Sequence, residues 1–437
     1  MQSRHLRVAA ALVGAATMAA TAPPVRAQQP AAGTTAYVGA RVIFGDERPP
    51  LENATVVVRG GRFVQVGPAR EVQVPAGAAR VDLTGKTVMP TLVDTHVHLN
   101  LVRSQLIQDR QANAYWGIGA VTSLGSDDID LVLQVRGETH PHAAQLLTAG
   151  RGITMPEPER PASKLLYQIR SVDEGRQAVR QLAARRADIV KIWVDDRNGT
   201  VQKMPPEVYR AIIDEAHHHG LKVVAHIVEL ADAKALVRAG LDGFAHGVRD
   251  RDVDDEFITL LKEHPHVILI ANLPSRGAKL DVSWLRDHVP ADELAKLQAA
   301  TADRTEAQRR SFDIQARNLA RLAKEGVTIA VGIDFNVVYD MHVEMEDMVA
   351  AGMTPAQVVI AATRNGAQLL GLVRESGSVE VGKHADFVVL DANPLDDITN
   401  TRRISGVYLK GVAVDRAGLL AQWKKAGTLC GDCDKRR

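Results

Sequence analysis

Cysteine is scarce in this 437-residue chain, which contains only Cys430 and Cys433. A disulfide framework therefore does not hold the fold together. An excess of charge of one sign is also lacking, because 53 Lys and Arg residues face 52 Asp and Glu residues and leave a formal net charge of +1. Without a strong basic field, nucleic acid and anionic membranes are not expected as partners. The 46% hydrophobic and 24% charged residues exclude a disordered, collagen-like or coiled-coil chain.

Residues 1–27 have the pattern of a secretory signal peptide. Arg4 and Arg7 precede an apolar stretch, Val8–Ala22, that is short for a membrane span. Small residues, Val25 and Ala27, then stand at the positions required for cleavage near Ala27. A membrane anchor kept in the mature chain is the alternative, but two prolines end the stretch and no second apolar run follows. We therefore expect an exported protein, periplasmic or secreted, without a stable membrane anchor.

Both ends of the mature chain are rich in short β-branched runs. Residues 35–89 contain three such runs, and Gly60-Gly61 between the last two predicts a hairpin turn. Residues 377–416 have the same texture. Because neither segment is long enough for a core of its own, we expect them to pair in one small β-sandwich domain. Residues 417–437 are expected to form a C-terminal tail whose two cysteines, in an oxidising compartment, make a local disulfide.

Residues 90–376 alternate between apolar strands and helices without internal repeats, which indicates a parallel sheet in an α/β fold. About eight strands are expected, the number in a (β/α)8 barrel of the TIM type, although composition alone leaves an open sheet as an alternative. A polar stretch at 292–325 predicts a long helical region, and Thr354-Pro355 predicts a helix start. The predicted strands are Thr91–Thr95, Ala120–Leu124, Ala144–Thr148, Asp188–Val194, Leu221–His226, Asp242–His246, Val267–Ala271 and Val327–Gly332.

An apolar strand, Val88–Val93, runs into the sequence Asp94-Thr95-His96-Val97-His98. The period of a strand places His96 and His98 on one face, about 6–7 Å apart in Cα, so two imidazoles can bind one ion. In a parallel barrel the functional face lies at the C-terminal ends of the strands. Two other His-x-His pairs do not end a strand and are predicted to be surface residues: His140, His142, His264 and His266.

A lysine, Lys191, interrupts the apolar run Ile189–Val194. Because burial of an unpaired ammonium is costly, we expect this amine to lose its proton. A neutral amine can add CO₂ and become a carbamate, an anion able to bridge two cations. The alternative is an ordinary ion pair with Asp188, Asp195 or Asp196 at the end of the strand.

Three further strand ends carry a potential metal ligand. Val223–His226 and Gly243–His246 each end with histidine, and Ile329–Asp334 ends with a carboxylate. A lone strand-end histidine is more often a core residue, but two in succession after the His-x-His pair favour a shared site. By contrast, His217-His218-His219 precede Gly220 at a helix C-terminus, where positive charge is favourable, and are predicted to face solvent.

Together these residues resemble the amidohydrolase superfamily, in its binuclear branch with a carboxylated lysine. Within that superfamily the chain looks most like the imidazolonepropionase-like and dipeptidase-like group. The resemblance extends over about residues 36–416. It includes the downstream motifs Ala351-Gly352-Met353-Thr354-Pro355, Thr363-Arg364-Asn365-Gly366-Ala367, Gly382-Lys383-His384-Ala385-Asp386 and Asn393-Pro394-Leu395.

The resemblance implies a centre of two divalent cations, Zn²⁺ first, because the ligands are nitrogen and oxygen without thiolate. It implies that a hydroxide bridging the cations attacks an amide or lactam carbonyl while Asp334 carries a proton to the leaving amine. The implied ligands are His96, His98 and Asp334 for the first cation, His226 and His246 for the second, and carboxylated Lys191 between them.

The expected substrates are small amides such as dipeptides or N-acyl amino acids. Dipeptidase relatives often carry a Gly-rich stretch after the lysine, whereas this chain has Trp193-Val194-Asp195-Asp196. Arg249, in preference to Arg151, is the candidate clamp for a substrate carboxylate, and a solvated loop arginine is the alternative for both. His342 is expected to be structural, at a helix start with Glu344.

Two other readings of the whole chain stay open. One is a mononuclear deaminase- or lactonase-like hydrolase that uses the same histidines and aspartate without lysine carboxylation. The other is a non-catalytic periplasmic protein that binds a metal or a ligand. A homo-oligomer is compatible with the sequence.

Overall fold

The computed structural model describes residues 33–157, 161–274, 276, 281–299, 305–334 and 337–426. The predicted signal peptide and the predicted disulfide between Cys430 and Cys433 lie outside these ranges. Within them, every helix is too short or too polar to cross a bilayer.

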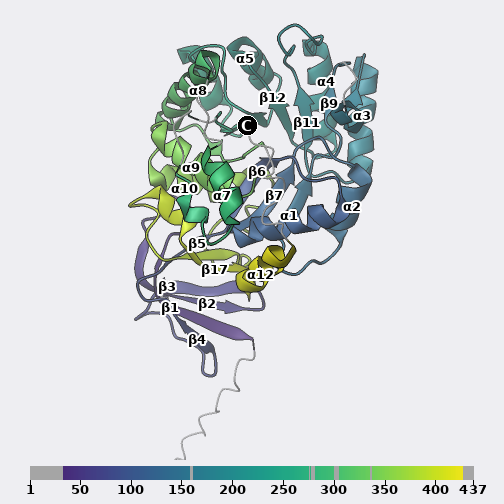
Figure 1. Cartoon of the computed structure of the whole chain (residues 1–437). Helices are drawn as coiled ribbons and strands as arrows, with labels where there is room; N and C mark the ends of the chain where they lie inside the picture. Colours follow the sequence, from purple (N-terminus) through teal and green to yellow (C-terminus); the bar gives the residue numbers. More distant parts are fainter. Residues whose placement is uncertain are drawn as a thin grey trace, which may run out of the picture.

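One sheet is built from both ends of the described chain, and we call it the terminal sheet (Figure 1). Its strands are β1 (Thr34–Val42), β2 (Leu51–Arg59), β3 (Arg62–Pro68), β4 (Ala79–Asp82), β5 (Thr87–Pro90), β16 (Phe387–Leu390), β17 (Ile404–Leu409) and β18 (Val412–Ala413). They run in the order β18-β17-β16-β5-β1-β2-β3, with β4 paired to β1. The antiparallel pairing of β16 with β5 joins the two ends of the chain.

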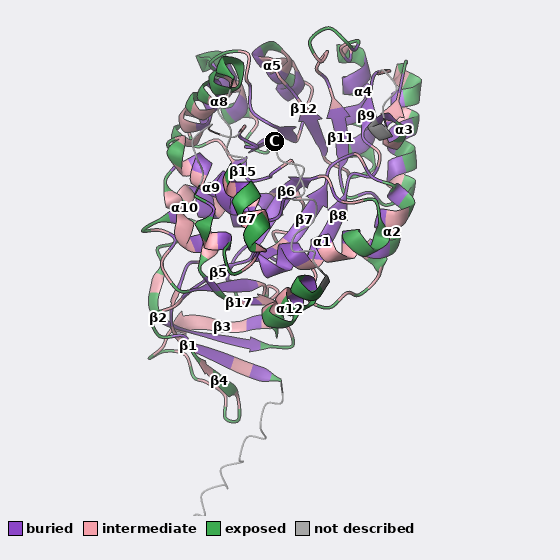
Figure 2. Cartoon of the chain, viewed as in Figure 1, coloured by how far each residue is buried: buried purple, intermediate pink, exposed green. Residues whose placement is uncertain are grey.

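The remaining strands pair in parallel and form two sheets. One has the order β6-β7-β8: β6 (Leu92–Val97), β7 (Ile118–Ser123) and β8 (Gln145–Thr148). The other has the order β10-β9-β11-β12-β13-β14-β15: β9 (Ile153–Thr154), β10 (Tyr167–Gln168), β11 (Val190–Trp193), β12 (Val223–His226), β13 (Gly243–Ala245), β14 (Ile268–Ile270) and β15 (Ile329–Ala330). Their residues are almost all buried, as parallel strands covered by helices require (Figure 2).

Most of the helices connect these strands and lie on their outer side (Figure 1), whereas the last one follows β18 and lies beside the terminal sheet. Those between β6 and β14 are α1 (Arg103–Tyr115), α2 (Ile129–Gly137), α3 (Val172–Ala184), α4 (Pro206–His218), α5 (Leu230–Arg238) and α6 (Asp255–Glu263). Those after β14 are α7 (Ala291–Ala299), α8 (Glu306–Lys324), α9 (Asp340–Ala350), α10 (Pro355–Ile360), α11 (Gly366–Leu369) and α12 (Arg416–Ala426). A π-helical turn, Ala361–Asn365, separates α10 from α11, and short 3₁₀ turns cover Pro161–Leu165, Ser283–Leu285 and Ile398–Arg402.

The local helix signals of the sequence behave as predicted at α10. Thr354 caps it, and Gln357 returns the contact in a capping box with Pro355 at the first turn. The polar stretch at 292–325 is divided between α7 and α8, with residues 300–304 outside the described ranges. The segment expected as a C-terminal tail begins instead with α12. Its Leu419 and Trp423, one helical turn apart, are buried, a spacing that the sequence reading overlooked.

The predicted α/β fold with parallel strands is confirmed, but a closed eight-stranded barrel is not, because the described parallel strands form two sheets. Backbone hydrogen bonds from Thr95 to Val331 (3.1 Å) and from Asp188 to Thr148 (2.8 Å) link the two sheets. The short strands β9 and β10 were not predicted, since two residues are too few to show a period. Beyond Ala330 the chain leaves β14 and bonds to His96, which is why β15 is shorter than the predicted Val327–Gly332.

The predicted β-sandwich is also not confirmed. The two ends of the chain do pair, but they form a single sheet. Hydrogen bonds join Phe63 to Lys383 (3.0 Å) and to Gly382 (2.8 Å), so the outer edge of β3 meets the residues that precede β16. The terminal sheet has its own core of buried residues, which includes Tyr37 and Phe387.

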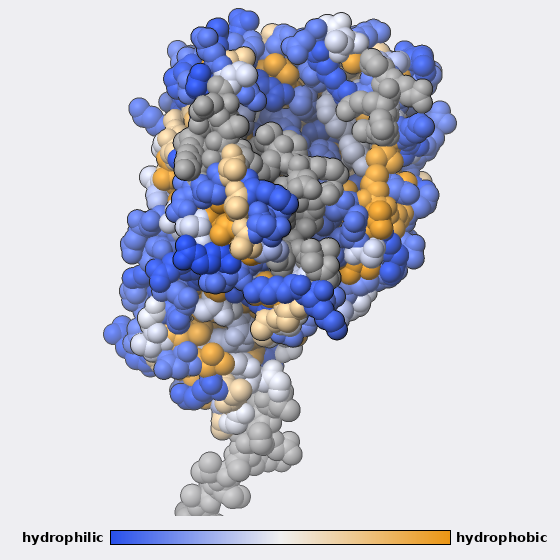
Figure 3. All heavy atoms as spheres, in the orientation of Figure 1, coloured by the Kyte–Doolittle hydropathy of each residue, from blue (hydrophilic) through white to orange (hydrophobic). Residues whose placement is uncertain are grey.

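The surface shown in Figure 3 is largely hydrophilic and is interrupted by small hydrophobic patches. The large hydrophobic residues that are exposed within the described ranges are Leu101, Val102, Val381 and Val412.

Candidate metal centre

The candidate ligands lie at the C-terminal ends of parallel strands, next to a layer of buried apolar side chains from the same strands. In β12, Val224 belongs to a buried apolar cluster and His226 lies two residues further, on the same face. In the next strands, His226 pairs with Ala245, and Ala245 with Ile270. This register brings the residues that follow β12, β13 and β14 to one edge of the sheet.

Five of the predicted ligands lie together, three from that edge and two from the end of β6 in the other parallel sheet, and we call the five, with Lys191, the strand-end cluster. Asp334 Oδ1 is 2.9 Å from His96 Nε2 and 3.2 Å from His98 Nε2, and Asp334 Oδ2 is 3.6 Å from His246 Nε2. The His246 ring centroid is 5.2 Å from that of His96 and 4.8 Å from that of His226. One triad, His96, His246 and Asp334, has ligand atoms all within 4.8 Å of one another.

The backbone around His96 holds this geometry in place. The carbonyl of His96 accepts hydrogen bonds from the amides of Ile333 (3.1 Å) and Asp334 (2.7 Å). A Cβ added to Gly332 would lie 2.8 Å from the His96 Cβ, so only glycine allows this close approach. His246 and Asp334 themselves have φ values of 74° and 61°. Such conformations are costly for residues other than glycine and concentrate at functional sites.

Burial sets the protonation of these groups. It lowers the pKa of His96 to about 4, and it lowers the pKa values of His226 and His246 well below their usual range. Burial alone would raise the pKa of Asp334, but the charges of His96 and His246 hold it well below its usual value. At neutral pH the cluster therefore presents neutral imidazoles and an ionised carboxylate, the forms that bind metal ions.

Lys191 is 1% exposed, and its Nζ has no hydrogen-bond partner among the described residues. Burial lowers the pKa of this amine to about 7, while the charges of Asp334 and Asp195 oppose the shift. The expected loss of the proton is thus reached near neutral pH, and the alternative of an ion pair with Asp188, Asp195 or Asp196 is not found. Asp188 instead binds Arg136 at 2.6 Å.

Trp193 covers Lys191, with its ring centroid 5.3 Å from Nζ. Two glycines make room for this arrangement. A Cβ at Gly152 would lie 2.3 Å from the Trp193 ring, and one at Gly125 would lie 2.9 Å from the Lys191 side chain. The wall next to Lys191 is therefore aromatic in this chain.

The donor set fits a divalent cation. His96 Nε2 and Asp334 Oδ1 are close, yet Nε2 lacks a partner with hydrogen-bond geometry within the described ranges. A buried nitrogen lone pair facing a carboxylate oxygen is satisfied when both bind one cation. Nitrogen and oxygen donors without thiolate suit Zn²⁺ and its neighbours in the first transition row.

Arg249 is half-buried beside the cluster instead of solvated in its loop. Its Nη2 lies 3.0 Å from His226 Nε2. Asp195 also approaches this nitrogen, at 3.7 Å. Because Nε2 has one lone pair, the Arg249 contact and a cation at His226 exclude each other, and Arg249 must release His226 before a cation binds there.

Several other candidates lie outside the cluster, as the sequence predicts. Arg151 donates to the Leu166 carbonyl (2.7 Å) and stacks on Tyr167. His342 is fully buried within α9, between Thr401 Oγ1 and the Trp116 carbonyl, each at 3.0 Å. The remaining histidines belong to surface or helix-end contacts: His140, His142, His217, His218, His219, His264 and His266.

Sequence reasoning missed Asn272, which lies two residues after β14. Its Oδ1 is 2.9 Å from His96 Nδ1. The only sequence signal was a polar residue directly after the apolar strand Val267–Ala271. A single asparagine at that place is typical of a loop, so the pattern did not distinguish it.

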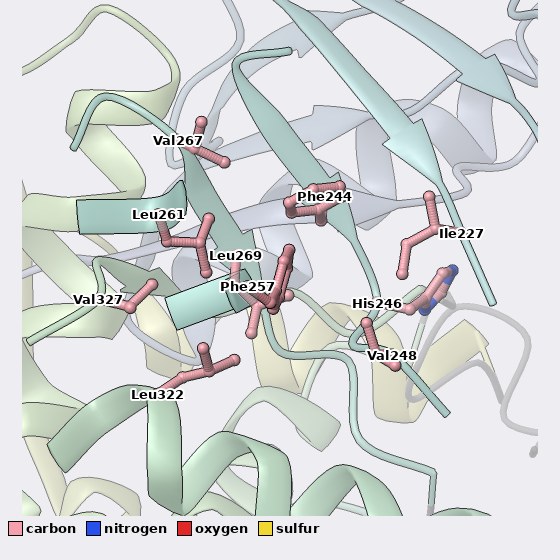
Figure 4. A pocket seen from close by; sticks show the side chains of 10 residues that line it. All are labelled: Ile227, Phe244, His246, Val248, Phe257, Leu261, Val267, Leu269, Leu322 and Val327. Atoms are coloured by element: carbon pink, nitrogen blue, oxygen red, sulfur yellow. The ribbon is translucent and has the colours of Figure 1, made fainter. Parts of the chain in front are cut away.

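A small apolar cavity of about 10 Å³ lies behind His246. Figure 4 shows its lining side chains, with His246 at one end and its ring nitrogens turned away from Phe257 and Leu269. The cavity holds about one water at most and is no substrate site. Its apolar walls contribute to the burial that keeps His246 neutral.

Comparison with known proteins gives matches of both sequence and fold. The chain matches the amidohydrolase family over residues 87–414. The ochratoxinase of Aspergillus niger is 28% identical over 263 residues, 56% of this chain and 50% of that protein, so the match spans half the length of this relative. The imidazolonepropionase of Deinococcus radiodurans is 27% identical over 397 residues, 83% of this chain and 92% of that one. A presumed prolidase from Bifidobacterium longum superposes with a TM-score of 0.73 at 28% identity, covering 90% of this chain and 99% of its own.

Proposed function

The chain belongs to the amidohydrolase family, and on that premise we propose that it hydrolyses amide or peptide-like carbon–nitrogen bonds in small molecules. The observation that carries the proposal is the convergence of four histidines and Asp334. The amine of Lys191, which has no hydrogen-bond partner among the described residues, is close enough to interact electrostatically with Asp334, His96 and His226. Dipeptides and N-acyl amino acids are the proposed substrates. The similarity to a presumed prolidase and to an ochratoxinase supports this substrate class.

We propose that the cluster holds two divalent cations, most simply Zn²⁺. His96, His98 and Asp334 would hold the first, and His226 and His246 the second. Bound cations would polarise the substrate carbonyl and make water acidic enough to attack at neutral pH. The side chains of the cluster would bind the cations and orient the substrate carbonyl and the water. The buried ends of the strands would keep bulk water away from them.

Lys191 is proposed to bridge the two cations as a carbamate. A neutral amine is the form that adds CO₂, and burial brings the pKa of Lys191 to about 7. Among the described residues, the Nζ of Lys191 has no hydrogen-bond partner. As a carbamate, the side chain would gain the two cations as partners. Trp193 and the two glycines beside it would shield the carbamate from water.

Asp334 and Arg249 are proposed to act on the substrate. Asp334 Oδ1 faces both His96 and His98, and Oδ2, which lies further from its neighbour His246 (3.6 Å), would accept a proton from the attacking water and return it to the leaving amine. Arg249, once released from His226, would bind a substrate carboxylate through its remaining N–H groups. This role matches dipeptides and N-acyl amino acids, which both carry a free carboxylate.

A mononuclear hydrolase, deaminase- or lactonase-like, is the second candidate. It is favoured by the compact triad of His96, His246 and Asp334, which could hold one ion without Lys191. In that case Lys191 would stay a free amine, and mass spectrometry of the native protein would find no added CO₂.

Export and domain division remain proposals as well. We propose cleavage near Ala27, a barrel domain at 90–376 in which the two parallel sheets close into one wall, and a smaller domain of 35–89 with 377–416. Amino-terminal sequencing of the protein recovered from the periplasm or medium tests the cleavage. A mature chain that still begins at Met1 would contradict it.

The function is tested with protein stripped by a chelator and reloaded with Zn²⁺. It is offered dipeptides, Xaa-Pro dipeptides, N-acyl amino acids, lactams and lactones. We expect hydrolysis of at least one amide class, lost on stripping and restored on reloading. Two Zn²⁺ per chain support the binuclear centre, one supports the mononuclear alternative, and tight Zn²⁺ binding without any turnover supports a non-catalytic binding protein.

A further inference from the structure

Asn272 lies at the end of β14 and touches the strand-end cluster, because its Oδ1 is 2.9 Å from His96 Nδ1. We propose that Asn272 is a positioning residue for the cation centre. Its carboxamide oxygen keeps the ring proton of His96 on Nδ1, so that the lone pair of Nε2 points at the cation. This inference rests on the proposed function only in so far as it requires a cation at His96.

The proton assignment follows from the chemistry of the two groups. A neutral imidazole carries one N–H, and a carboxamide oxygen can only accept a hydrogen bond. With the proton on Nδ1, Nε2 is a bare acceptor 2.9 Å from Asp334 Oδ1, which is an acceptor too. A cation between the two acceptors would bind both of them. Metal-binding histidines commonly donate their other ring N–H to an oxygen acceptor, as His96 does to Asn272.

Asn272 destabilises the folded chain, which argues that its role is not to stabilise the fold. It is 5% exposed, and its Nδ2 is buried without a hydrogen-bond partner in the described part of the chain. Its φ of 41° lies in the left-handed region. An unpaired buried donor and a strained backbone both destabilise the folded chain, and such costs gather at functional sites.

The neighbours of Asn272 hold it in this conformation. The amide of Ala271 donates to the Ala330 carbonyl (3.0 Å), and the amide of Leu273 donates to Glu344 Oε1 (2.7 Å) in α9. Both sides of the strained residue are therefore anchored. His98 has no such support, because its Nδ1 is buried without a partner among the described residues. Within the His-x-His pair, only the ring of His96 is thus fixed by a hydrogen bond at Nδ1 among the described residues.

Two variants separate the carboxamide oxygen from the rest of Asn272. Asn272→Gly removes the side chain and suits a positive φ, whereas Asn272→Asp keeps an oxygen facing Nδ1. Zn²⁺ affinity is measured on the stripped full chain by competition with a chromophoric chelator. We expect Asn272→Gly to bind Zn²⁺ about 10–100-fold more weakly and Asn272→Asp to retain the wild-type affinity.

The matched control is Asn113→Ala in α1. Asn113 is also buried, with one amide hydrogen bond and one unpartnered atom within the described ranges, but it lies outside the cluster. It should leave Zn²⁺ affinity unchanged. Thermal unfolding of the metal-free proteins adds a second readout, in which Asn272→Gly should melt at or above the wild-type temperature.

Two results would overturn the positioning role. One is wild-type Zn²⁺ affinity in Asn272→Gly, which together with a lowered melting temperature would indicate a structural role instead. The other is an equal loss of affinity in Asn272→Asp. Failure of the proposed function is distinguishable. A wild-type chain that binds no Zn²⁺ removes both proposals, whereas one that binds Zn²⁺ but hydrolyses nothing removes the function alone.

Discussion

The strand-end cluster and the terminal sheet both contain fully buried side chains, but these side chains have opposite chemistry. In the terminal sheet, Phe63 and Phe387 are fully buried and pack against other rings, with Phe387 stacked on Tyr408 at 4.4 Å between centroids. In the cluster, His96 and Lys191 are each 1% exposed but polar, and the Lys191 amine lacks a partner in the described residues. Burial stabilises the first region and costs free energy in the second. The difference separates the part of the molecule that holds the fold from the part arranged for chemistry.

The largest effect is expected from Asp334→Asn, which changes the strand-end cluster and leaves the terminal sheet unaltered. The amide keeps the shape but cannot accept a proton at neutral pH, and it is a weaker cation ligand. We expect kcat to fall about 10²–10⁴-fold on any amide that the wild type hydrolyses. Unfolding in urea checks that the variant is still folded. A variant with more than a tenth of the wild-type kcat would remove Asp334 from the proton transfer.

Phe387→Ala should produce the reverse pattern. Removal of a fully buried ring from the terminal sheet is expected to lower the free energy of unfolding by about 3–5 kcal/mol. Zn²⁺ content and kcat per folded molecule should stay at wild-type values, because the ring belongs to a separate core. Denaturant unfolding and a metal assay on the same preparation check both. A fall in Zn²⁺ content at full folding would show that the two regions are coupled.

Lys191→Met tests the cost of the buried amine. Methionine fills a similar volume without a polar head, so the metal-free variant should be more stable than the wild type by about 1–3 kcal/mol. Turnover and one equivalent of cation should be lost. Chemical denaturation and metal analysis measure the two effects. Lower stability in the variant would mean that the amine has partners that stabilise the fold.

The effect expected to be smallest at neutral pH lies outside the cluster, at His342, and it grows as the pH falls. Burial lowers the pKa of His342 to about 3, whereas the unfolded chain binds this proton below about 6.5. Stability is therefore lost as the pH falls from about 6.5 towards 3, by at most about 1.4 kcal/mol per pH unit for this group. His342→Gln, measured by unfolding at several pH values, should reduce that slope by one proton. An unchanged slope would show that other groups dominate the acid transition.

The sequence predicted much of the candidate site because its ligands end regular strands. A lysine inside the apolar run Ile189–Val194 and histidines at the ends of two other apolar runs depart visibly from the pattern of a buried strand. The left-handed φ values of His246 and Asp334 left no such signal, and neither did the contact of Arg249 with His226. These depend on how each loop leaves its strand, which local pattern does not encode.

The amino-acid sequence by itself determined which donors are available and at which level of each strand they stand, because side chains alternate strictly along an extended backbone. Tertiary structure decided which atoms face one another. Asn272 reaches His96 across 176 residues of sequence, and both chain ends share one sheet where a sandwich was expected. Such neighbours follow from the order in which strands pack, and that order is chosen by the burial of the whole core.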